Sequence, residues 1–213
     1  DATRAVVGGG SVHSPSVTNE MDYVTIQTTG NALDFGDITQ ARREIGNTND
    51  ATRGVFIGGE VTAQVNTIDY ITTQTTGNAI DFGDTTNSVY GAHTGICADE
   101  TRGLYMGGIT SPNTFAYNTI EYLTIQTTGN GTDFGDLTIA REQLASCSSN
   151  TRGLFGGGTD SGGSKSNVID YVTIASTGNA TDFGDLTVAR DGLTACSSGV
   201  RGLFAGGNTS KDT

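Results

Sequence analysis

The sequence predicts an all-β fold made of short antiparallel strands, because one pattern recurs about every 49 residues. An Arg followed by four residues and then a Gly-Gly pair occurs five times, and successive copies of this Arg lie 49, 49, 50 and 49 residues apart. The chain also contains 32 Gly, only 2 Pro and much Thr, a composition that suits strands joined by Gly turns. A period near 50 is typical of the four-stranded blades of a β-propeller. We therefore expect a β-propeller built from antiparallel blades of about 49 residues. The five copies begin at Arg4, Arg53, Arg102, Arg152 and Arg201.

Each element of one repeat can be predicted from residues 144–185. Two short strands are separated by a Ser-Ser-Asn turn, and the second of them ends at Gly156-Gly157-Gly158. A third strand follows a polar loop and is rich in β-branched and aromatic residues. Residues 176–179 join it to a fourth strand, since Gly and Asn tolerate the positive φ of a hairpin turn. The expected strands are 144–147, 152–155, 167–174 and 180–186.

The spacing between recurring positions distinguishes a part of the repeat with constant length from a part whose length varies. The interval from the Tyr of the third strand to the Phe of the fourth is 12 residues in all four copies, which predicts a fixed hairpin register. The interval from Gly-Gly to Tyr varies from 11 to 14 residues, and the second repeat has two additional residues within 87–93. Variable loops should therefore lie on one rim of the array, where repeat proteins vary their contacts. The constant pairs are Tyr23 and Phe35, Tyr70 and Phe82, Tyr122 and Phe134, and Tyr171 and Phe183.

The repeats extend over the whole chain, so residues 1–213 form one array of repeated units. There are five Gly-Gly strands but only four Tyr strands and four Phe strands. We therefore expect a segment of a longer propeller, or a chain that completes its ring with another copy, because open strand edges favour pairing. The approximate units are 1–41, 42–88, 89–140, 141–189 and a partial unit at 190–213.

The three cysteines occupy equivalent places in the repeat. Cys97, Cys147 and Cys196 each lie five residues before the repeated Arg, and Thr48 takes that place in an earlier copy. Their spacing does not form a Cys-x-x-Cys pair of the kind that binds metal. We expect all three to be free thiols that are buried as small apolar side chains.

The motifs of the repeat resemble those of kelch-type propellers. The likeness consists of an opening Arg, a strand that ends in Gly-Gly, and an Asn-x-apolar-acid-Tyr strand such as 167–171. It implies that the opening Arg residues connect adjacent blades through carboxylates or carbonyls. The chain departs from the family because it has no Trp, with Phe in its place, and the repeat that follows Asp84 has no opening Arg. The structural residues implied are Arg42, Arg141, Arg190, Gly9, Gly10, Gly58, Gly59, Gly107, Gly108, Gly157, Gly158, Gly206 and Gly207.

The segments Thr-Thr-Gly-Asn-Ala and Asp-Phe-Gly-Asp-Leu-Thr are also similar to repeats in virion structural proteins of marine cyanobacterial phages. That resemblance implies a phage tail, fibre or capsid-surface component located in the virion. Its expected partners are other virion proteins or further copies of itself, with a host-surface glycan as a further contact. An extracellular or secreted protein is the alternative.

Charge and composition exclude several classes of partner. The net charge of −12 and the pI near 4.3 argue against nucleic acid, which requires a basic surface. No run of about 18 apolar residues predicts membrane insertion, and no motif indicates a cofactor. Asp-Phe-Gly matches a kinase metal motif, but it recurs in every repeat without the other kinase motifs. Carboxylates such as Asp34 and Asp37 could bind Ca²⁺ weakly, although turn capping or pairing with the opening Arg is the favoured interpretation.

No set of catalytic residues stands out from the repeat. The only histidines, His13 and His93, lie on variable segments, and the acids recur with the fold. We therefore expect a non-enzymatic structural or adhesion protein. The alternative is a propeller enzyme, such as a lyase, an oxidase or a glycan hydrolase, whose active site lies in the unique loops or in chain outside this sequence. Candidate contact residues are the loop side chains Tyr90, His93, Phe115 and Tyr117.

Overall fold

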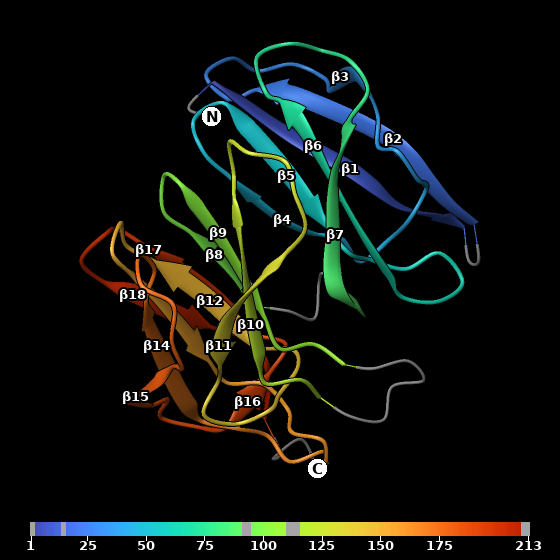
Figure 1. The fold of residues 1–213 in the computed structure, drawn as a ribbon. Coiled ribbons are helices and arrows are strands. Elements are labelled where there is room, and N and C mark those ends of the chain that lie inside the picture. Colours follow the sequence, from blue (N-terminus) through green and yellow to red (C-terminus); the bar gives the residue numbers. More distant parts are fainter. Residues whose placement is uncertain (1–2, 14–15, 91–94, 110–115, 210–213) are drawn as a thin grey trace.

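The computed structural model describes residues 3–13, 16–90, 95–109 and 116–209, and every regular element in these ranges is a β-strand. The strands form a series of antiparallel sheets that follow one another in chain order (Figure 1). The all-β class and the four-stranded antiparallel repeat predicted from the sequence are confirmed.

Three of the sheets have four strands each, and in each the strands pair in chain order. The second sheet contains β4 (Gly46–Asn49), β5 (Arg53–Ile57), β6 (Val65–Thr72) and β7 (Ile80–Val89). The third sheet contains β8 (Gly95–Ala98), β9 (Arg102–Met106), β10 (Thr119–Thr124) and β11 (Thr132–Asp136). The fourth sheet contains β12 (Ala145–Ser148), β13 (Arg152–Gly156), β14 (Val168–Thr173) and β15 (Thr181–Asp185).

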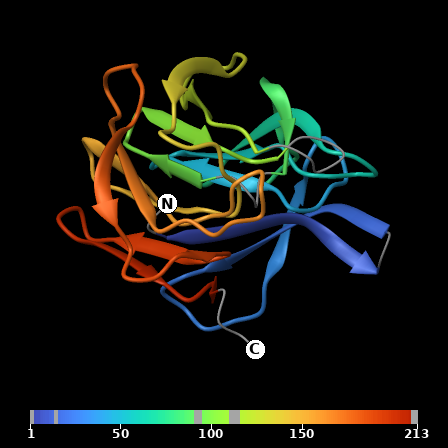
Figure 2. The ribbon, with the colours of Figure 1, turned by 90° about the horizontal axis from the view of Figure 1, so that it is seen from below.

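The sheets at the two ends of the series have fewer strands. The first sheet contains β1 (Arg4–His13), β2 (Ser16–Thr25) and β3 (Leu33–Asp37). The terminal sheet contains only β17 (Thr194–Ser197) and β18 (Gly202–Ala205), beside a short pair formed by β16 (Arg190–Asp191) and β19 (Asn208–Thr209). Figure 2 shows the sheets in succession, from the first sheet in blue to the terminal sheet in red.

In the three four-stranded sheets, the Gly-Gly pair follows the second strand because a side chain does not fit there, whereas in the first sheet Gly9-Gly10 lies within β1. Gly58 and Gly59 have φ values of 61° and 114°, in a region that favours glycine. A Cβ atom on Gly58 would lie 2.6 Å from the carbonyl oxygen of Val89. Backbone segments therefore pack directly against each other at this point, as the sequence predicts for strand-ending glycines.

The hydrophobic core lies between successive sheets rather than within one sheet. Leu104 and Phe134 of the third sheet pack in one cluster with Val172 and Ile174 at the fourth sheet. Similar clusters join the second sheet to the third and the first sheet to the second. Each sheet therefore depends on its neighbours for the burial of its apolar side chains, as in other repeat proteins.

A second contact between sheets is a set of backbone hydrogen bonds made by the Gly-Asn turn, the connection between the third and fourth strands of each sheet. In the second sheet, Gly77 N donates to Phe35 O at 2.7 Å and Ala79 N donates to Asp37 O at 2.7 Å. Asp37 N in turn donates to Asn78 Oδ1 at 3.1 Å. The Gly-Asn turns of the third and fourth sheets repeat these bonds on the preceding sheet, through Gly129, Asn130 and Gly131 and through Gly178, Asn179 and Ala180.

The prediction that all three cysteines are buried is wrong for one of them. Cys97 and Cys147 are buried, whereas Cys196 is exposed. Each buried thiol is covered by a glycine of the next sheet: a Cβ on Gly153 would lie 2.8 Å from Cys97 Sγ, and one on Gly202 would lie 2.8 Å from Cys147 Sγ. Cys196 belongs to the terminal sheet, and no later sheet covers it within the described residues.

Candidate binding site at the third sheet

In the second and fourth sheets, the opening Arg forms an ion pair in the interior. Arg42 Nη1 lies 2.7 Å from Asp69 Oδ2, and Arg141 Nη2 lies 2.9 Å from Asp170 Oδ2, with all four side chains fully buried. Both guanidinium groups also donate to the first carbonyl of the Gly-Gly pair, such as Gly58 O at 2.8 Å from Arg42 Nε. A buried charge requires an opposite charge and hydrogen-bond partners of this kind.

The same residues connect each sheet to the one before it. The carboxylate of Asp170 accepts a hydrogen bond from Thr138 Oγ1 at 2.6 Å, and Thr138 follows the third sheet. The backbone carbonyl of Arg141 accepts a bond from Gly108 N at 3.3 Å. Burial lowers the pKa of Arg141, and the adjacent Asp170 carboxylate opposes this change. The pair therefore fixes the boundary between the third and fourth sheets.

Arg190 occupies the same place in the terminal sheet but has fewer contacts. Its Nη1 donates to Gly206 O at 3.1 Å, the counterpart of the bonds made by Arg42 and Arg141. It has no ion pair with a carboxylate, because the terminal sheet has no third strand within the described residues.

The third sheet replaces the Arg–Asp pair with a Tyr–Glu pair. Gly91 stands six residues before Cys97, where the other sheets have Arg. Glu121 takes the place of Asp69 and Asp170, and Tyr105 takes the place of a Phe. The Tyr105 hydroxyl donates to the buried Glu121 carboxylate, and Thr86 N donates to Glu121 Oε2 at 3.2 Å. In the described part of the chain, Glu121 makes no ion pair.

A fourth substitution makes room for this pair. Gly131 follows the Gly-Asn turn of the third sheet, where the other copies have Ala32, Ala79 and Ala180. A Cβ on Gly131 would lie 1.9 Å from Tyr105 Oη and 2.5 Å from Glu121 Oε2. The hydroxyl therefore occupies the space that an alanine methyl group fills in the other sheets.

Burial governs the protonation of both members of the pair. It raises the pKa of Glu121, while the hydrogen bonds from Tyr105 and Thr86 act in the opposite direction. Burial also raises the pKa of Tyr105, and the neighbouring Glu121 charge raises it further. Tyr105 is therefore a neutral hydrogen-bond donor at physiological pH, and its partner is a carboxyl group that ionises less readily than usual.

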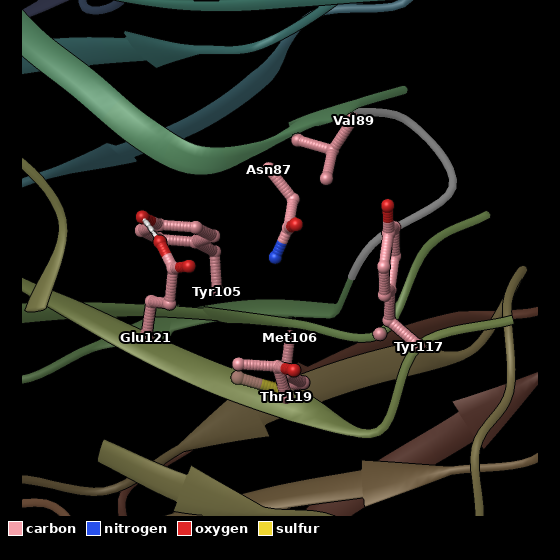
Figure 3. A pocket seen from close by; sticks show the side chains of 8 residues that line it. Asn87, Val89, Tyr105, Met106, Tyr117, Thr119 and Glu121 are labelled. Atoms are coloured by element: carbon pink, nitrogen blue, oxygen red, sulfur yellow. Dashed lines mark hydrogen bonds between the residues drawn. The ribbon is translucent and has the colours of Figure 1, made fainter. Parts of the chain in front are cut away.

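A small pocket opens beside the pair, in the place that Arg141 fills in the fourth sheet (Figure 3). Arg141 contacts Phe155, Gly157, Val168 and Asp170. Their counterparts all line the pocket: Tyr105, Gly107, Thr119 and Glu121. The volume of about 10 Å³ is sufficient for about one water molecule. The arrangement can thus accept a hydrogen bond from one small group, and a larger ligand would contact only the mouth.

The mouth of the pocket is formed by side chains from one strand end and one connection. Asn87 and Val89 come from β7, which extends to Val89 because the second repeat carries its additional residues there. Tyr117 comes from the connection between β9 and β10 and stands on the side of the pocket away from Tyr105 and Glu121 (Figure 3). Polar and aromatic groups therefore meet where two variable segments lie side by side.

The four contact residues predicted from the sequence lie in different environments or outside the described residues. Tyr117 lines the pocket. The hydroxyl of Tyr90 donates to Glu60 Oε1 at 3.3 Å, and Glu60 also pairs with Arg43, so Tyr90 helps to hold its own loop. His93 and Phe115 lie outside the described residues.

Sequence reasoning missed Asn87, Tyr105, Thr119 and Glu121 as site residues. The available signal was that four departures from the repeat fall in one unit: the absent opening Arg, Tyr105, Glu121 and Gly131. The last three are each conservative changes in a repeat, whereas the absent Arg is not. Together they indicate that one buried pair has been exchanged for another.

The described residues show neither a cluster of metal ligands nor a helix that could span a membrane. Within the described ranges, no group of three or more His, Cys, Asp or Glu residues could hold a metal ion. Asp34 Oδ1 accepts a hydrogen bond from Gly36 N at 3.1 Å, which is the turn-capping role favoured from the sequence. The described chain has no helix with the length and apolar character needed to cross a membrane.

Comparison with protein-family models finds none that matches this chain, and no curated protein matches it.

Proposed function

We propose that this chain is a kelch-like β-propeller module with a structural or adhesion role, in which variable rim loops contact other molecules. The observation that carries the proposal is the uniform use of polar groups in the interior. Asp69 and Asp170 neutralise arginines, and the Gly-Asn turns connect successive sheets through equivalent bonds. Among the three four-stranded sheets, the third departs from this scheme, and it does so beside two variable segments.

The propeller geometry is supported by the equivalence of the contacts between sheets. Phe35, Phe82 and Phe134 accept the same bond from the next Gly-Asn turn at 2.7, 2.8 and 2.7 Å. Equivalent contacts between equivalent units relate each sheet to the next by a similar rotation, which is the basis of a propeller or another regular array.

The proposed contact face is the mouth of the third-sheet pocket. Asn87 offers an amide and Tyr117 offers an amphipathic ring, and both come from segments that differ from the other repeats. Amide and aromatic side chains together suit a polar ring such as a sugar, because the amide binds hydroxyl groups while the ring covers a C–H face. A glycan is therefore the ligand class that we favour at this face.

The proposed setting is the surface of a phage virion, as a tail, fibre or capsid component. It is supported by the resemblance of the repeat sequence to virion structural proteins and by a net charge of −12, which favours solubility. A repeat array can also be extended without new chemistry. Mass spectrometry of purified virions should detect the protein in fixed stoichiometry. A cellular location together with turnover of a small substrate would contradict the proposal.

The contact face can be tested with a glycan array, followed by titration of any glycan that binds. Tyr117→Ala should weaken binding by about tenfold or more, the usual effect of removing a central aromatic residue. Ile80→Ala is the control for loss of a large side chain, since Ile80 is exposed and lies at the hairpin end of its sheet rather than in the pocket lining. Binding that survives Tyr117→Ala unchanged would remove the pocket mouth from the proposal.

A further inference from the structure

We propose that Asn130 is a site of spontaneous deamidation that the closed boundary between the second and third sheets suppresses, so that opening of this boundary leaves an irreversible change in the chain. The inference does not depend on the proposed function, because it concerns the backbone chemistry of one Gly-Asn turn. Three observations carry it: the sequence of the turn, the hydrogen bonds that hold its reactive groups, and the Tyr105–Glu121 pair, which requires the glycine.

Asn130 is the only asparagine in the sequence that is followed by glycine. Deamidation begins when the backbone nitrogen of the next residue attacks the carbonyl carbon of the asparagine side chain. A Cβ on that next residue hinders the attack, whereas glycine has none and adopts the widest range of φ. Asn130 is therefore the most reactive asparagine of the chain wherever the backbone is free to move. The equivalent turns have Asn followed by Ala, at Asn31, Asn78 and Asn179.

The reaction needs no cofactor and no reactant other than water. Gly131 N loses its proton and bonds to Asn130 Cγ, while the Cγ–Nδ2 bond breaks and the side-chain nitrogen leaves as ammonia with that proton. Water then opens the cyclic imide. Addition at Cγ gives Asp, and addition at the backbone carbonyl carbon gives isoaspartate, whose main chain runs through Cβ and Cγ. Asn130 is exposed, so water can reach the ring.

In the closed structure, the backbone of Asp84 holds both reacting groups. Gly131 N donates to Asp84 O at 2.8 Å, and Asp84 N donates to Asn130 Oδ1 at 3.1 Å. Attack requires the nitrogen to lose the proton that it donates to Asp84 O. It also requires the carboxamide to turn toward that nitrogen while Asp84 N holds its oxygen. The reaction therefore depends on the turn leaving the second sheet.

The Tyr105–Glu121 pair explains why the third sheet keeps this reactive sequence. A Cβ on Gly131 would lie 2.5 Å from Glu121 Oε2 and still closer to Tyr105 Oη. The alanine that the other turns carry at this position does not fit here. The exchange of the buried pair and the reactive turn therefore occur in the same sheet for one structural reason.

Isoaspartate at position 130 would prevent the boundary from closing again. In the closed boundary, Gly129 N donates to Phe82 O and Gly131 N donates to Asp84 O, both at 2.8 Å. Isoaspartate places an additional carbon in the main chain between these two amide groups. The longer segment cannot keep both bonds in register, so the change is one-way and leaves the turn detached from the second sheet.

The first test incubates the full, unmodified chain in native buffer and in urea at slightly alkaline pH and identifies the products by peptide mass spectrometry. In urea, Asn130 should convert before every other asparagine, to a mixture of Asp and isoaspartate. In native buffer its conversion should be slower by at least about tenfold, which corresponds to about 1.4 kcal/mol for opening the boundary. Equal rates in the two conditions, or a different asparagine that converts first in urea, would overturn the proposal.

Gly83→Ala tests whether the boundary controls the reaction. A Cβ on Gly83 would lie 2.5 Å from Gly129 O, so the methyl group should push the turn away and leave the Asn130-Gly131 sequence intact. Conversion of Asn130 in native buffer should become about tenfold faster or more. Gly36→Ala is the matched control, because its Cβ would meet Gly77 at the same distance of 2.5 Å on the boundary between the first and second sheets. This control should leave the rate at Asn130 unchanged.

Ala180→Gly places a second Asn-Gly sequence in the fourth sheet. There Ala180 N donates to Asp136 O at 2.8 Å and Asp136 N donates to Asn179 Oδ1 at 3.1 Å, the same bonds that hold the third-sheet turn. Asn179 should then convert as Asn130 does, readily in urea and more slowly in native buffer. The variant adds no atom, so it tests the proposal even if Gly83→Ala does not fold.

Three results with these variants would also overturn the proposal. One is an unchanged rate at Asn130 in a Gly83→Ala chain that circular dichroism shows to be folded. Another is an equal acceleration at Asn130 by Gly36→Ala. The third is an Asn179 that, in the Ala180→Gly chain, converts in native buffer as fast as in urea. These measurements concern one covalent change, so their outcome is separate from that of the glycan and virion experiments.

Discussion

The third and fourth sheets have the same strands and register but neutralise a buried acid in different ways. In the fourth sheet, Asp170 pairs with Arg141, whose guanidinium also binds three backbone carbonyls. In the third sheet, Glu121 accepts a hydrogen bond from Tyr105, and the counterparts of the remaining partners border a small pocket. The repeat can therefore lose its central cation at one position and keep its backbone, provided that the longer Glu and the Tyr hydroxyl come together.

The largest difference between the two sheets should appear when the ion pair is broken. Arg141→Met keeps much of the side-chain volume but leaves Asp170 buried without a cation. We expect a loss of about 3–5 kcal/mol in the free energy of unfolding, the usual cost of an uncompensated buried charge. Urea unfolding followed by circular dichroism would measure it.

Arg190→Met is the matched control in the terminal sheet. Arg190 has no ion pair with a carboxylate within the described residues, so its replacement should change the free energy of unfolding by no more than about 0.5 kcal/mol. Equal losses for the two variants would mean that the ion pair is not what distinguishes Arg141.

A smaller effect is expected from restoring the alanine of the other repeats in the third sheet. Gly131→Ala places a methyl group against Tyr105 Oη and Glu121 Oε2. We expect a loss of about 1–3 kcal/mol from overpacking. Thermal and urea unfolding would measure this loss.

Tyr105→Phe decides whether the hydroxyl is the cause. In the double variant, it should reduce the loss of unfolding free energy that Gly131→Ala causes, because it removes Tyr105 Oη, the atom nearest to the added methyl group. Tyr105→Phe alone should cost about 1–3 kcal/mol, since it removes a donor from a buried carboxyl group. If the two losses simply added, Gly131 and Tyr105 would be independent of each other.

Most of the fold could be predicted because its signals recur in every repeat. The 12-residue interval from Tyr to Phe fixes the hairpin register, and the Gly-Gly pair marks the end of the second strand. Burial was harder to predict, because it depends on the neighbouring sheet rather than on the residue. Cys196 has the sequence context of Cys147 but lacks the glycine of a following sheet.

The candidate site was less predictable for a related reason. Tyr117 stood out as a loop aromatic, but Tyr105 and Glu121 look like ordinary variants of a repeated Phe and a repeated Asp. Only the three-dimensional contacts show that they touch each other and that Gly131 makes room for them. A pairwise exchange of this kind cannot be recognised from one position at a time.

The smallest expected effect is a pH dependence that differs in sign between two acids. Burial raises the pKa of Glu121, so the folded state holds this proton more tightly than the unfolded state does. Protonated Glu121 thus contributes stability at low pH, and that contribution is lost as the pH rises from the ordinary carboxyl range through the raised pKa. Glu121→Gln should therefore gain stability relative to the unmodified protein as the pH increases from about 4 to about 8.

Burial alone would raise the pKa of Asp50 as well, but hydrogen bonds from Arg53, Gln126 and Thr52 outweigh it and lower that pKa. Asp50→Asn should for that reason lose stability relative to the unmodified protein as the pH rises through the lowered pKa to the ordinary carboxyl range near about 4, and it should change little above that range. Urea unfolding of the three proteins from about pH 2 to about pH 8 would measure both trends, and a parallel response of the two variants would show that burial does not control the Glu121 carboxyl group.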